Sequence, residues 1–297
     1  MLSPQDHDSL ARLQLLARGV VDGFTGGRHR SPHKGASVEF KEHRQYVRGD
    51  ELRSIDWKLY GKSDRLFIRQ YEDETNLRAM ILLDQSGSMA YRGSRSELSK
   101  HDFAIRLAAC LATLLIKQQD AVGLATFDTQ LQQTIPPRST TGHLRTIYET
   151  LVQSRCGAET GLASVLQQAA GQLRRRGILL LISDCFDAVT PLLRALRPYR
   201  HSGSEVVVFQ IWDRDELEFP FHTRTQFRSL ENVSQQHIID PNSMRAAYLE
   251  RLDQYRSELA SGLAQERIDL VSCTTDQQLG ELLSAYMNRR LSRKANR

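Results

Sequence analysis

The middle of the chain alternates short apolar runs with amphipathic stretches. Each run is five to eight residues long and is bounded by polar or turn-forming residues, so it is too short for a typical helix. Continuous apolar runs of this length are typical of strands that are buried on both faces. The predicted strands are Leu77–Leu83, Ala121–Phe127, Leu131–Ile135, Gly177–Ser183, Glu205–Trp212 and Ile268–Cys273.

Apolar residues at helical spacing occupy the segments between these runs. Strands that alternate with helices form right-handed crossovers, which place helices on both faces of a parallel sheet. We therefore predict an α/β fold with a doubly wound, mostly parallel sheet of the Rossmann-like kind. The predicted helices lie at Phe103–Leu115, 140–154, 161–175, Pro191–Tyr199, Met244–Leu259 and Leu279–Tyr286.

The first 75 residues depart from this alternation. A helix is predicted at 6–23 and a basic loop at 24–37. Two extended segments follow, near 39–47 and 65–73, and they indicate a small β appendage. We therefore expect residues 1–75 to form an N-terminal part that consists of a helix and a basic β appendage.

A second departure lies within the C-terminal half. At 213–241, Pro220 and polar turns indicate a short β excursion. A helix and the strand Ile268–Cys273 follow, so the alternation resumes. We expect an insertion at about 213–265 within one domain that spans 76–290, followed by a basic tail at 291–297.

The composition argues against a membrane-spanning, exported or zinc-binding protein. Uninterrupted apolar runs such as Ile178–Ile182 are far shorter than the ~20 residues that a membrane-spanning helix needs. Charged residues interrupt the N-terminus before the core of a signal peptide could form. The four cysteines form no Cys-x-x-Cys pair, so the sequence offers no zinc or dithiol motif. We expect reduced, mostly buried thiols and a cytoplasmic protein.

The net charge of +5 is unevenly distributed over the 297 residues. Residues 28–69 carry eleven Lys or Arg against six Asp or Glu, and residues 288–297 carry five basic residues and no acid. Basic segments bind nucleic acid, anionic lipid or acidic protein surfaces. Because the sequence contains no recognised nucleic-acid motif or aromatic platform, charge alone gives nucleic-acid binding little support.

Side chains with oxygen atoms follow the predicted strands at points that a parallel sheet brings together. Asp84, Ser86 and Ser88 come directly after the first apolar run, Thr160 precedes a helix, and Asp184 ends a later run. Ligand sites of such sheets form at the carboxyl ends of the strands. Carboxylates and hydroxyls suit a hard cation such as Mg²⁺ better than zinc. The pattern therefore predicts a cation site at this edge, although Asp-x-Ser-x-Ser alone also occurs in turns and helix caps.

These residues resemble the metal-ion-dependent adhesion site of von Willebrand factor A domains. In that family, two serines and a threonine bind Mg²⁺ through hydroxyls, and two aspartates hold the ion largely through waters. The family's last aspartate is usually followed by glycine, whereas Cys185 follows it here. The resemblance implies a site for Mg²⁺ or Mn²⁺ formed by Asp84, Ser86, Ser88, Thr160 and Asp184.

The N-terminal part extends the resemblance. Arg44-x-Tyr46-x-x-Gly49-Asp50, followed by Arg53-x-Ile55-Asp56-Trp57, is similar to the signature of the bacterial domain-of-unknown-function family fifty-eight. That family joins this segment to a von Willebrand factor A-like domain. Its members are typically encoded beside AAA+ ATPases of the MoxR type. The resemblance therefore implies a MoxR-type ATPase as partner in a chaperone-like system.

The segment Arg44–Trp57 leaves two interpretations open. Asp50, Arg53 and Asp56 could form an ion-pair network that locks the appendage onto the sheet, with Trp57 as its buried anchor. Alternatively, the segment is a docking surface, with Lys58, Lys62 and Arg65 on its exposed side.

Three functions are compatible with the sequence. The first, which we expect, is a metal-dependent protein-binding adaptor or co-chaperone without enzymatic activity, because neutral hydroxyl ligands leave the cation able to accept a partner's acidic side chain. The second is a Mg²⁺-dependent phosphatase or hydrolase with Asp84 as nucleophile. Such enzymes usually carry a second acid two residues later, where this chain has Ser86. The third is nucleic-acid binding through the basic segments.

Overall fold

The computed structural model describes residues 4–25, 37–47, 55–63, 65–74, 77–157, 161–170, 177–230 and 236–295. The chain divides into two compact units, which are described separately. The larger unit consists of residues 1–29 together with 78–297, and the smaller unit consists of residues 30–77.

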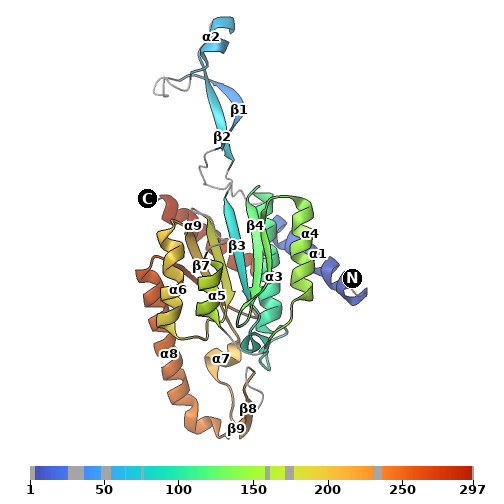
Figure 1. Ribbon diagram of the computed structural model, residues 1–297, viewed down its shortest axis with the longest axis vertical. Coiled ribbons are helices and arrows are strands. Elements are labelled where there is room, and N and C mark those ends of the chain that lie inside the picture. The colour runs from blue at the N-terminus through green and yellow to red at the C-terminus, as the bar shows by residue number, and fades with distance from the viewer. Residues whose placement is uncertain are drawn as a thin grey trace. The chain divides into compact units, whose positions relative to one another are not determined.

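A six-stranded sheet forms the centre of the larger unit, in the order β10-β7-β6-β3-β4-β5 (Figure 1). All neighbouring strands pair in parallel except β4 and β5, which are antiparallel. The predicted α/β fold with a mostly parallel sheet is therefore confirmed. The strands are β3 (Arg78–Asp84), β4 (Ala121–Phe127), β5 (Leu131–Arg138), β6 (Ile178–Ser183), β7 (Glu205–Trp212) and β10 (Asp269–Thr274).

Helices cover both faces of this sheet (Figure 1). Helices α3 (Lys100–Lys117), α4 (Thr141–Gln153) and α9 (Leu279–Ala295) lie on one side. Helices α5 (Leu162–Ala169), α6 (Val189–His201) and α8 (Pro241–Gln265) lie on the other. Because both faces are covered, the central strands β3 and β6 each contain an uninterrupted buried apolar run, Ala79–Leu83 and Ile178–Ile182, as the sequence predicts.

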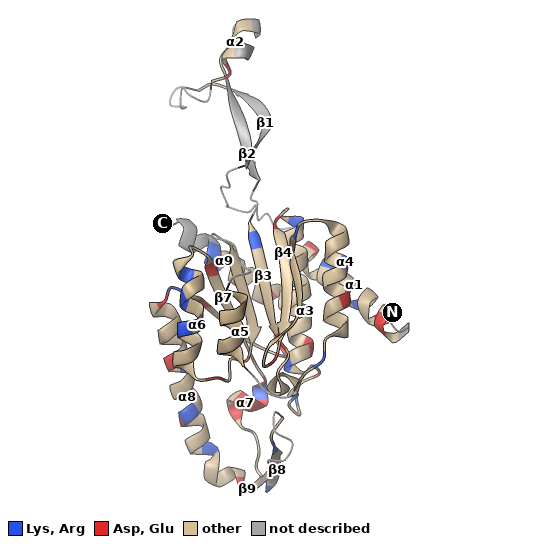
Figure 2. Ribbon diagram, viewed as in Figure 1, with Lys and Arg blue, Asp and Glu red and all other residues tan. Residues whose placement is uncertain are grey.

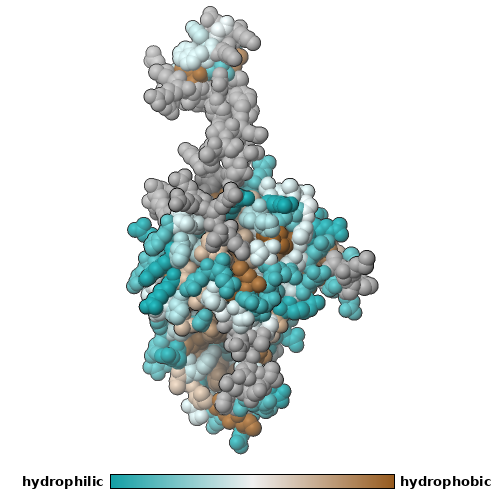
Figure 3. Space-filling model, viewed as in Figure 1, coloured by the Kyte–Doolittle hydropathy of each residue, from teal (hydrophilic) through white to brown (hydrophobic). Residues whose placement is uncertain are grey.

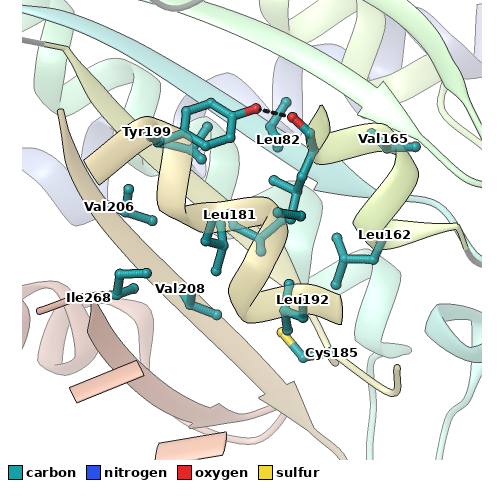
Figure 4. Close-up of a cluster of buried hydrophobic side chains, with 14 of the residues drawn as sticks. Leu82, Leu162, Val165, Leu181, Cys185, Leu192, Tyr199, Val206, Val208 and Ile268 are labelled. Carbon is teal, nitrogen blue, oxygen red and sulfur yellow. Dashed lines mark hydrogen bonds between the residues drawn. The ribbon is translucent and has the colours of Figure 1, made fainter. Parts of the chain in front are cut away.

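One large core cluster lies between the sheet and the α5–α6 layer (Figure 4). Leu82, Leu181 and Val208 come from three adjacent strands and are fully buried against the helices. Tyr199 carries a polar group into this core, and its hydroxyl donates a hydrogen bond to the Leu166 carbonyl at 2.5 Å. Burial of such side chains, at about 25 cal/mol per Å² of apolar surface, supplies the main driving force for this arrangement.

The N-terminal helix α1 (Pro4–Thr25) belongs to the larger unit and contacts α3, α4 and α9. Leu10, Leu13, Ala17 and Val21 are buried at helical spacing, so one face of α1 completes the outer layer. The expected N-terminal part of residues 1–75 therefore divides differently in the structure. The helix joins the sheet domain, and only residues 30–77 form the separate unit.

The strand β10 pairs in parallel with β7, which confirms that Ile268–Cys273 rejoins the main sheet. Between them lie the short helix α7 (Arg214–Glu218) and the antiparallel pair β8 (Thr225–Arg228) and β9 (Gln236–Ile239), followed by α8. Helix α8 packs on α6 and β10 through a buried stripe that includes Leu259 and Leu263. It is thus an ordinary crossover helix, and the insertion is shorter than the expected 213–265.

The described residues of the smaller unit form a two-stranded antiparallel sheet and one helix. β1 (Ser37–Gln45) pairs with β2 (Phe67–Glu74), with a bulge between Phe40 and Glu42, and α2 (Trp57–Ser63) lies in the connection between the two strands. The two extended segments predicted from the sequence are therefore present.

The compositional expectations can be compared with the described residues. Within them, no helix is long and apolar enough to cross a membrane. All four cysteines are unpaired thiols, and Cys110, Cys185 and Cys273 are buried while Cys156 is half-buried. The expectation that the thiols are mostly buried is therefore confirmed.

Candidate cation-binding site

The candidate site lies where the strand order reverses. The chain passes from β3 to β4 on one side and returns to β6 on the other, so β3 and β6 are neighbours at the switch point. Asp84 ends β3, and Asp184 directly follows β6. The crevice outside the carboxyl ends of the strands at such a point is the usual ligand site of open α/β sheets.

Asp84 is fully buried at the base of the site. Its Oδ1 accepts a hydrogen bond from the Ser86 backbone N–H at 2.8 Å, and its Oδ2 accepts one from the Ser183 hydroxyl at 2.5 Å. Burial and the nearby charge of Asp184 raise the pKa of Asp84 to about 7. A bound cation would favour the charged form, because it replaces the missing water and offsets the repulsion from Asp184.

The two serines of the motif converge beside this carboxylate. Ser86 Oγ and Ser88 Oγ are 3.1 Å apart, and Ser88 lies in a short 3₁₀ helix, Gly87–Ala90. Two oxygen ligands in adjacent positions of an octahedral Mg²⁺ site, each ~2.1 Å from the ion, are also about 3 Å apart. The spacing of the hydroxyls therefore fits a hard, octahedral cation such as Mg²⁺ or Mn²⁺.

The donor set contains few ionisable ligands. Among the residues that the structure describes, no three His, Cys, Asp or Glu side chains come together as a metal cluster. Zinc sites usually need such clusters. The donors present are carboxylate and hydroxyl oxygens, so the site fits a cation that keeps much of its own water.

The predicted fifth ligand, Thr160, lies outside the described residues, and its role stays a prediction. The residues on either side of this segment are described. The Gly157 N–H donates to the Gln85 carbonyl at 2.6 Å, and the Gly161 N–H donates to the Asp128 carbonyl at 3.1 Å. Both contacts are made with residues that directly follow β3 and β4, at the same edge of the sheet as Asp84.

Lys100 lies at the site, and the sequence pattern does not reveal it. Its side chain is fully buried, and its Nζ donates to Asp184 Oδ2 at 2.8 Å and to Glu216 Oε1 at 2.6 Å. Burial lowers the pKa of Lys100, but the two carboxylates more than compensate and hold it above its usual value. Lys100 is therefore a permanent positive charge that neutralises part of the acidic site.

This lysine offsets the added charge of Glu216, so the net charge of the site equals that of the two aspartates alone. Asp84, Asp184 and Glu216 supply three negative charges when ionised, and Lys100 supplies one positive charge. Two negative charges remain, which match a divalent cation. Because Lys100 holds one oxygen of Asp184 and the Phe186 N–H donates to the other at 3.1 Å, Asp184 has little freedom to reorient.

Helix α7 is tied to the loop that precedes α3 by a second set of carboxylates. Asp213 caps α7 and accepts a hydrogen bond from the Gly93 N–H at 2.9 Å. Asp215 accepts from the Ser94 N–H at 2.7 Å and from Arg95 Nε at 2.9 Å. Figure 2 shows acidic and basic residues side by side on α7. These bonds join segments about 120 residues apart in the chain and hold α7 against the site.

A comparison with models of protein families shows which family the chain belongs to. The family model described as "Protein of unknown function DUF58" matches residues 42–258, which is more than half of the chain. The chain belongs to this family. The motif resemblance therefore predicts the family correctly.

Similar proteins match most of the length of this DUF58 chain. The uncharacterized protein Rv1480 of Mycobacterium tuberculosis is 25% identical over 289 residues, which cover 95% of this chain and 89% of the relative. Among solved structures, BatB from Bacteroides thetaiotaomicron is similar with a TM-score of 0.48 and 16% identity, over 73% of this chain and 99% of BatB. The VWA domain of SpRpn10 is similar with a TM-score of 0.41 and 13% identity, over 70% of this chain and 94% of that domain.

The family-signature residues of the DUF58 chain lie in the smaller unit, and only some are described. Arg44 pairs with Ile68 in the β1–β2 register, and the Tyr46 N–H donates to the Leu66 carbonyl at 2.9 Å. Ile55 and Asp56 are buried. Gly49, Asp50 and Arg53 lie outside the described residues, so the proposed ion-pair network stays a prediction.

The Trp57 side chain is not buried within the smaller unit, where 62% of its surface is exposed, and its role as an anchor on the sheet stays a prediction. It begins α2, and Asp56 before it accepts a hydrogen bond from the Leu59 N–H at 3.1 Å, as helix-capping residues do. The signature therefore separates into a buried residue (Ile55), a cap (Asp56) and an exposed aromatic residue. Arg65 is exposed as the docking interpretation expects, whereas the side chains of Lys58 and Lys62 are not described.

The corner after β6 adopts a glycine-like conformation. Cys185 has a φ of 58°, in the left-handed region, at the position where von Willebrand factor A domains usually carry glycine. The thiol is fully buried in the core cluster (Figure 4). The turn that presents Asp184 therefore has the backbone conformation that glycine favours, with a buried cysteine in its place.

Gly93 is a position where a side chain cannot be accommodated. A Cβ at this residue would lie 2.1 Å from Asp213 Oδ1 and 2.8 Å from Asp215 Oδ2. We expect Gly93→Ala to lower the free energy of unfolding by about 2 kcal/mol, because it displaces a buried carboxylate from its donors. Urea denaturation measures this change. Gly142→Ala is the control, because a Cβ there meets nothing within 4 Å. Equal stability of both variants would contradict the close approach of Gly93 to α7.

Proposed function

We propose that this DUF58 protein is a protein-binding module that uses a divalent cation, Mg²⁺ or Mn²⁺, to recognise an acidic residue of a partner. The supporting observation is the convergence of Ser86 Oγ and Ser88 Oγ, 3.1 Å apart, beside the buried Asp84. Asp84, Ser86, Ser88 and Asp184 would hold the ion, with Thr160 as a predicted further ligand.

The chemistry of the ligands favours binding over catalysis. Hydroxyl ligands are neutral, so a bound cation would keep the affinity for one more carboxylate oxygen. Ser86 stands where an aspartyl phosphatase would need its second acid. Asp184 is held by Lys100 and the Phe186 N–H, so it is poorly placed to act as a general base. We therefore propose that the protein is not an enzyme.

The partner follows from the family resemblance. DUF58 members typically occur beside MoxR-type AAA+ ATPases, and we propose such an ATPase as the partner. The chain would then act as an adaptor or co-chaperone in the assembly or maturation of protein complexes. The α/β fold with its site at the switch point is consistent with a role in protein interaction.

The proposal predicts that Asp84→Ala abolishes cation binding and weakens partner binding. Calorimetric titration of Mg²⁺ into the wild-type protein should show binding that the variant lacks. Titration of a MoxR-type ATPase should show an affinity at least tenfold lower in the variant, or in wild type with EDTA. Asp253→Ala is the matched control, because Asp253 is an exposed carboxylate on α8 with a side chain 77% accessible.

Three results would contradict this proposal. Equal affinity for the ATPase with Mg²⁺ and with EDTA would exclude the cation from the interface. Mg²⁺-dependent hydrolysis of p-nitrophenyl phosphate that Asp84→Ala abolishes would favour the phosphatase alternative. A salt-dependent gel shift with DNA or RNA would favour nucleic-acid binding.

A further inference from the structure

The segment between β7 and α8 exposes apolar side chains that the proposed function does not use. Ile238 is 62% exposed on β9, Met244 is 45% exposed in the first turn of α8, and Leu230 is 44% exposed after β8. We call this the hairpin surface: residues 221–230 and 236–245. Figure 3 shows hydrophobic surface at the end of the molecule where β8 and β9 lie. Exposed apolar residues that gather in one part of a surface often mark interaction sites.

The hairpin surface is connected to the candidate cation site by an unbroken series of contacts. Lys100, which pairs with Asp184, also pairs with Glu216 of α7. The Tyr248 hydroxyl donates to the Glu216 carbonyl at 2.8 Å. The Tyr248 ring in turn packs on the Phe219 ring, with centroids 4.6 Å apart. Phe219 stacks on Phe227 of β8 with nearly parallel rings, 5.9 Å between centroids.

These contacts hold the hairpin surface in one position. Phe219 adopts a left-handed conformation with a φ of 46°, and its carbonyl accepts a hydrogen bond from Arg245 at 2.9 Å. The Asn242 side chain donates to the His222 carbonyl at 3.0 Å, which links the start of α8 to the chain before β8. A surface that is already ordered loses little conformational entropy when a partner binds.

The charges of the hairpin surface indicate the sign of its partner. Its described charged residues are Arg224, Arg228 and Arg245 against Asp240. Asp240 already serves as the cap of α8 by accepting from the Asn242 N–H at 3.1 Å. The surface is therefore basic and apolar, and it complements an acidic segment with apolar side chains. A cation at the candidate site would also attract a negatively charged partner, so both sites favour an acidic segment.

We propose that the hairpin surface is the second contact of the partner that binds the cation site. The occupant is an acidic protein segment that presents a carboxylate to the cation and places apolar side chains on Ile238 and Met244. This inference rests on the proposed function, and it assigns to the hairpin surface the specificity that a single metal-bound carboxylate cannot provide.

The test separates the two contacts by mutation. Ile238→Ser with Met244→Ser removes the apolar contact, and Arg224→Glu with Arg228→Glu reverses the charge. Leu15→Ser is the control, because Leu15 is 71% exposed on α1. Each variant is titrated with the MoxR-type ATPase, in Mg²⁺ and in EDTA, and with Mg²⁺ alone. We expect both double variants to bind the ATPase about tenfold more weakly while binding Mg²⁺ as wild type does, and Leu15→Ser to match wild type throughout.

The outcomes distinguish this inference from the proposed function. Mg²⁺-dependent binding of the ATPase that both double variants retain would overturn the role of the hairpin surface and leave the cation site intact. Failure of the wild-type protein to bind the ATPase in a Mg²⁺-dependent manner would overturn the proposed function, and this inference with it. Weakening by Leu15→Ser of the same size would show that the effect is not specific to the hairpin surface.

Discussion

We expect Lys100→Met to lower the free energy of unfolding by about 3–5 kcal/mol, which is the usual cost of breaking a buried ion pair by removing one partner. The Lys100 ammonium is fully buried and contacts both Asp184 and Glu216. Methionine fills a similar volume but leaves two carboxylates in an apolar environment without their counter-charge. A cation in the site would mask part of this loss, so urea denaturation should be carried out in EDTA.

Two comparisons identify the cause of this destabilisation. Lys117→Met removes an ion pair with Asp22 in which the Lys117 side chain is 39% exposed, so its effect should stay below about 1 kcal/mol. Replacing all three charges, in Lys100→Met with Asp184→Asn and Glu216→Gln, should recover part of the stability because no buried charge is then unpaired. A loss below 1 kcal/mol in Lys100→Met itself would mean that water reaches these carboxylates.

The second large effect is a loss of stability in mild acid that depends on His101. Its ring is buried, and its Nε2 is 3.0 Å from the Ser154 hydroxyl. Burial lowers the pKa of His101 to about 4, whereas an exposed histidine in the unfolded chain has a pKa of about 6.5. The unfolded chain therefore takes up a proton between these two values while the folded protein does not.

The sign of the effect follows from this difference in proton uptake. The contribution of neutral His101 to the free energy of unfolding is fully present above pH ~6.5. It is lost as the pH falls toward about 4, by up to ~1.4 kcal/mol per pH unit and about 3 kcal/mol in total. His101→Gln can still bond to Ser154 but does not titrate, so its stability relative to wild type should rise by about 3 kcal/mol as the pH falls from 6.5 to 4, while groups such as Asp84 affect both proteins equally. His7→Gln, at an exposed position on α1, should behave as wild type. Parallel pH profiles for wild type and His101→Gln would contradict the prediction.

The sequence by itself determined the sheet, because central strands that are buried on both faces must be apolar along their length. The apolar runs within β3 and β6 are of this kind. Their composition indicates that the strands are buried, and the first polar residue after each run marks where the strand ends. Asp84, Ser86 and Asp184 follow those ends directly. Parallel topology then brings these residues to one edge, so the core of the candidate site could be predicted without a structure.

Only the tertiary structure decided which side chains surround that site, because contacts between distant segments leave no periodic pattern in the chain. Lys100 and Asp184 are 84 residues apart, and Gly93 and Asp213 are 120 apart. A lysine in the first turn of a helix is only a weak sign of a special role, since the helix dipole disfavours it there. The apolar faces of α1 and α8 are visible in the sequence, but an apolar face does not specify its partner. Tertiary contacts place α1 in the sheet domain, where its apolar face packs on α3, α4 and α9. They likewise make α8 a crossover helix, because its apolar face packs on α6 and β10.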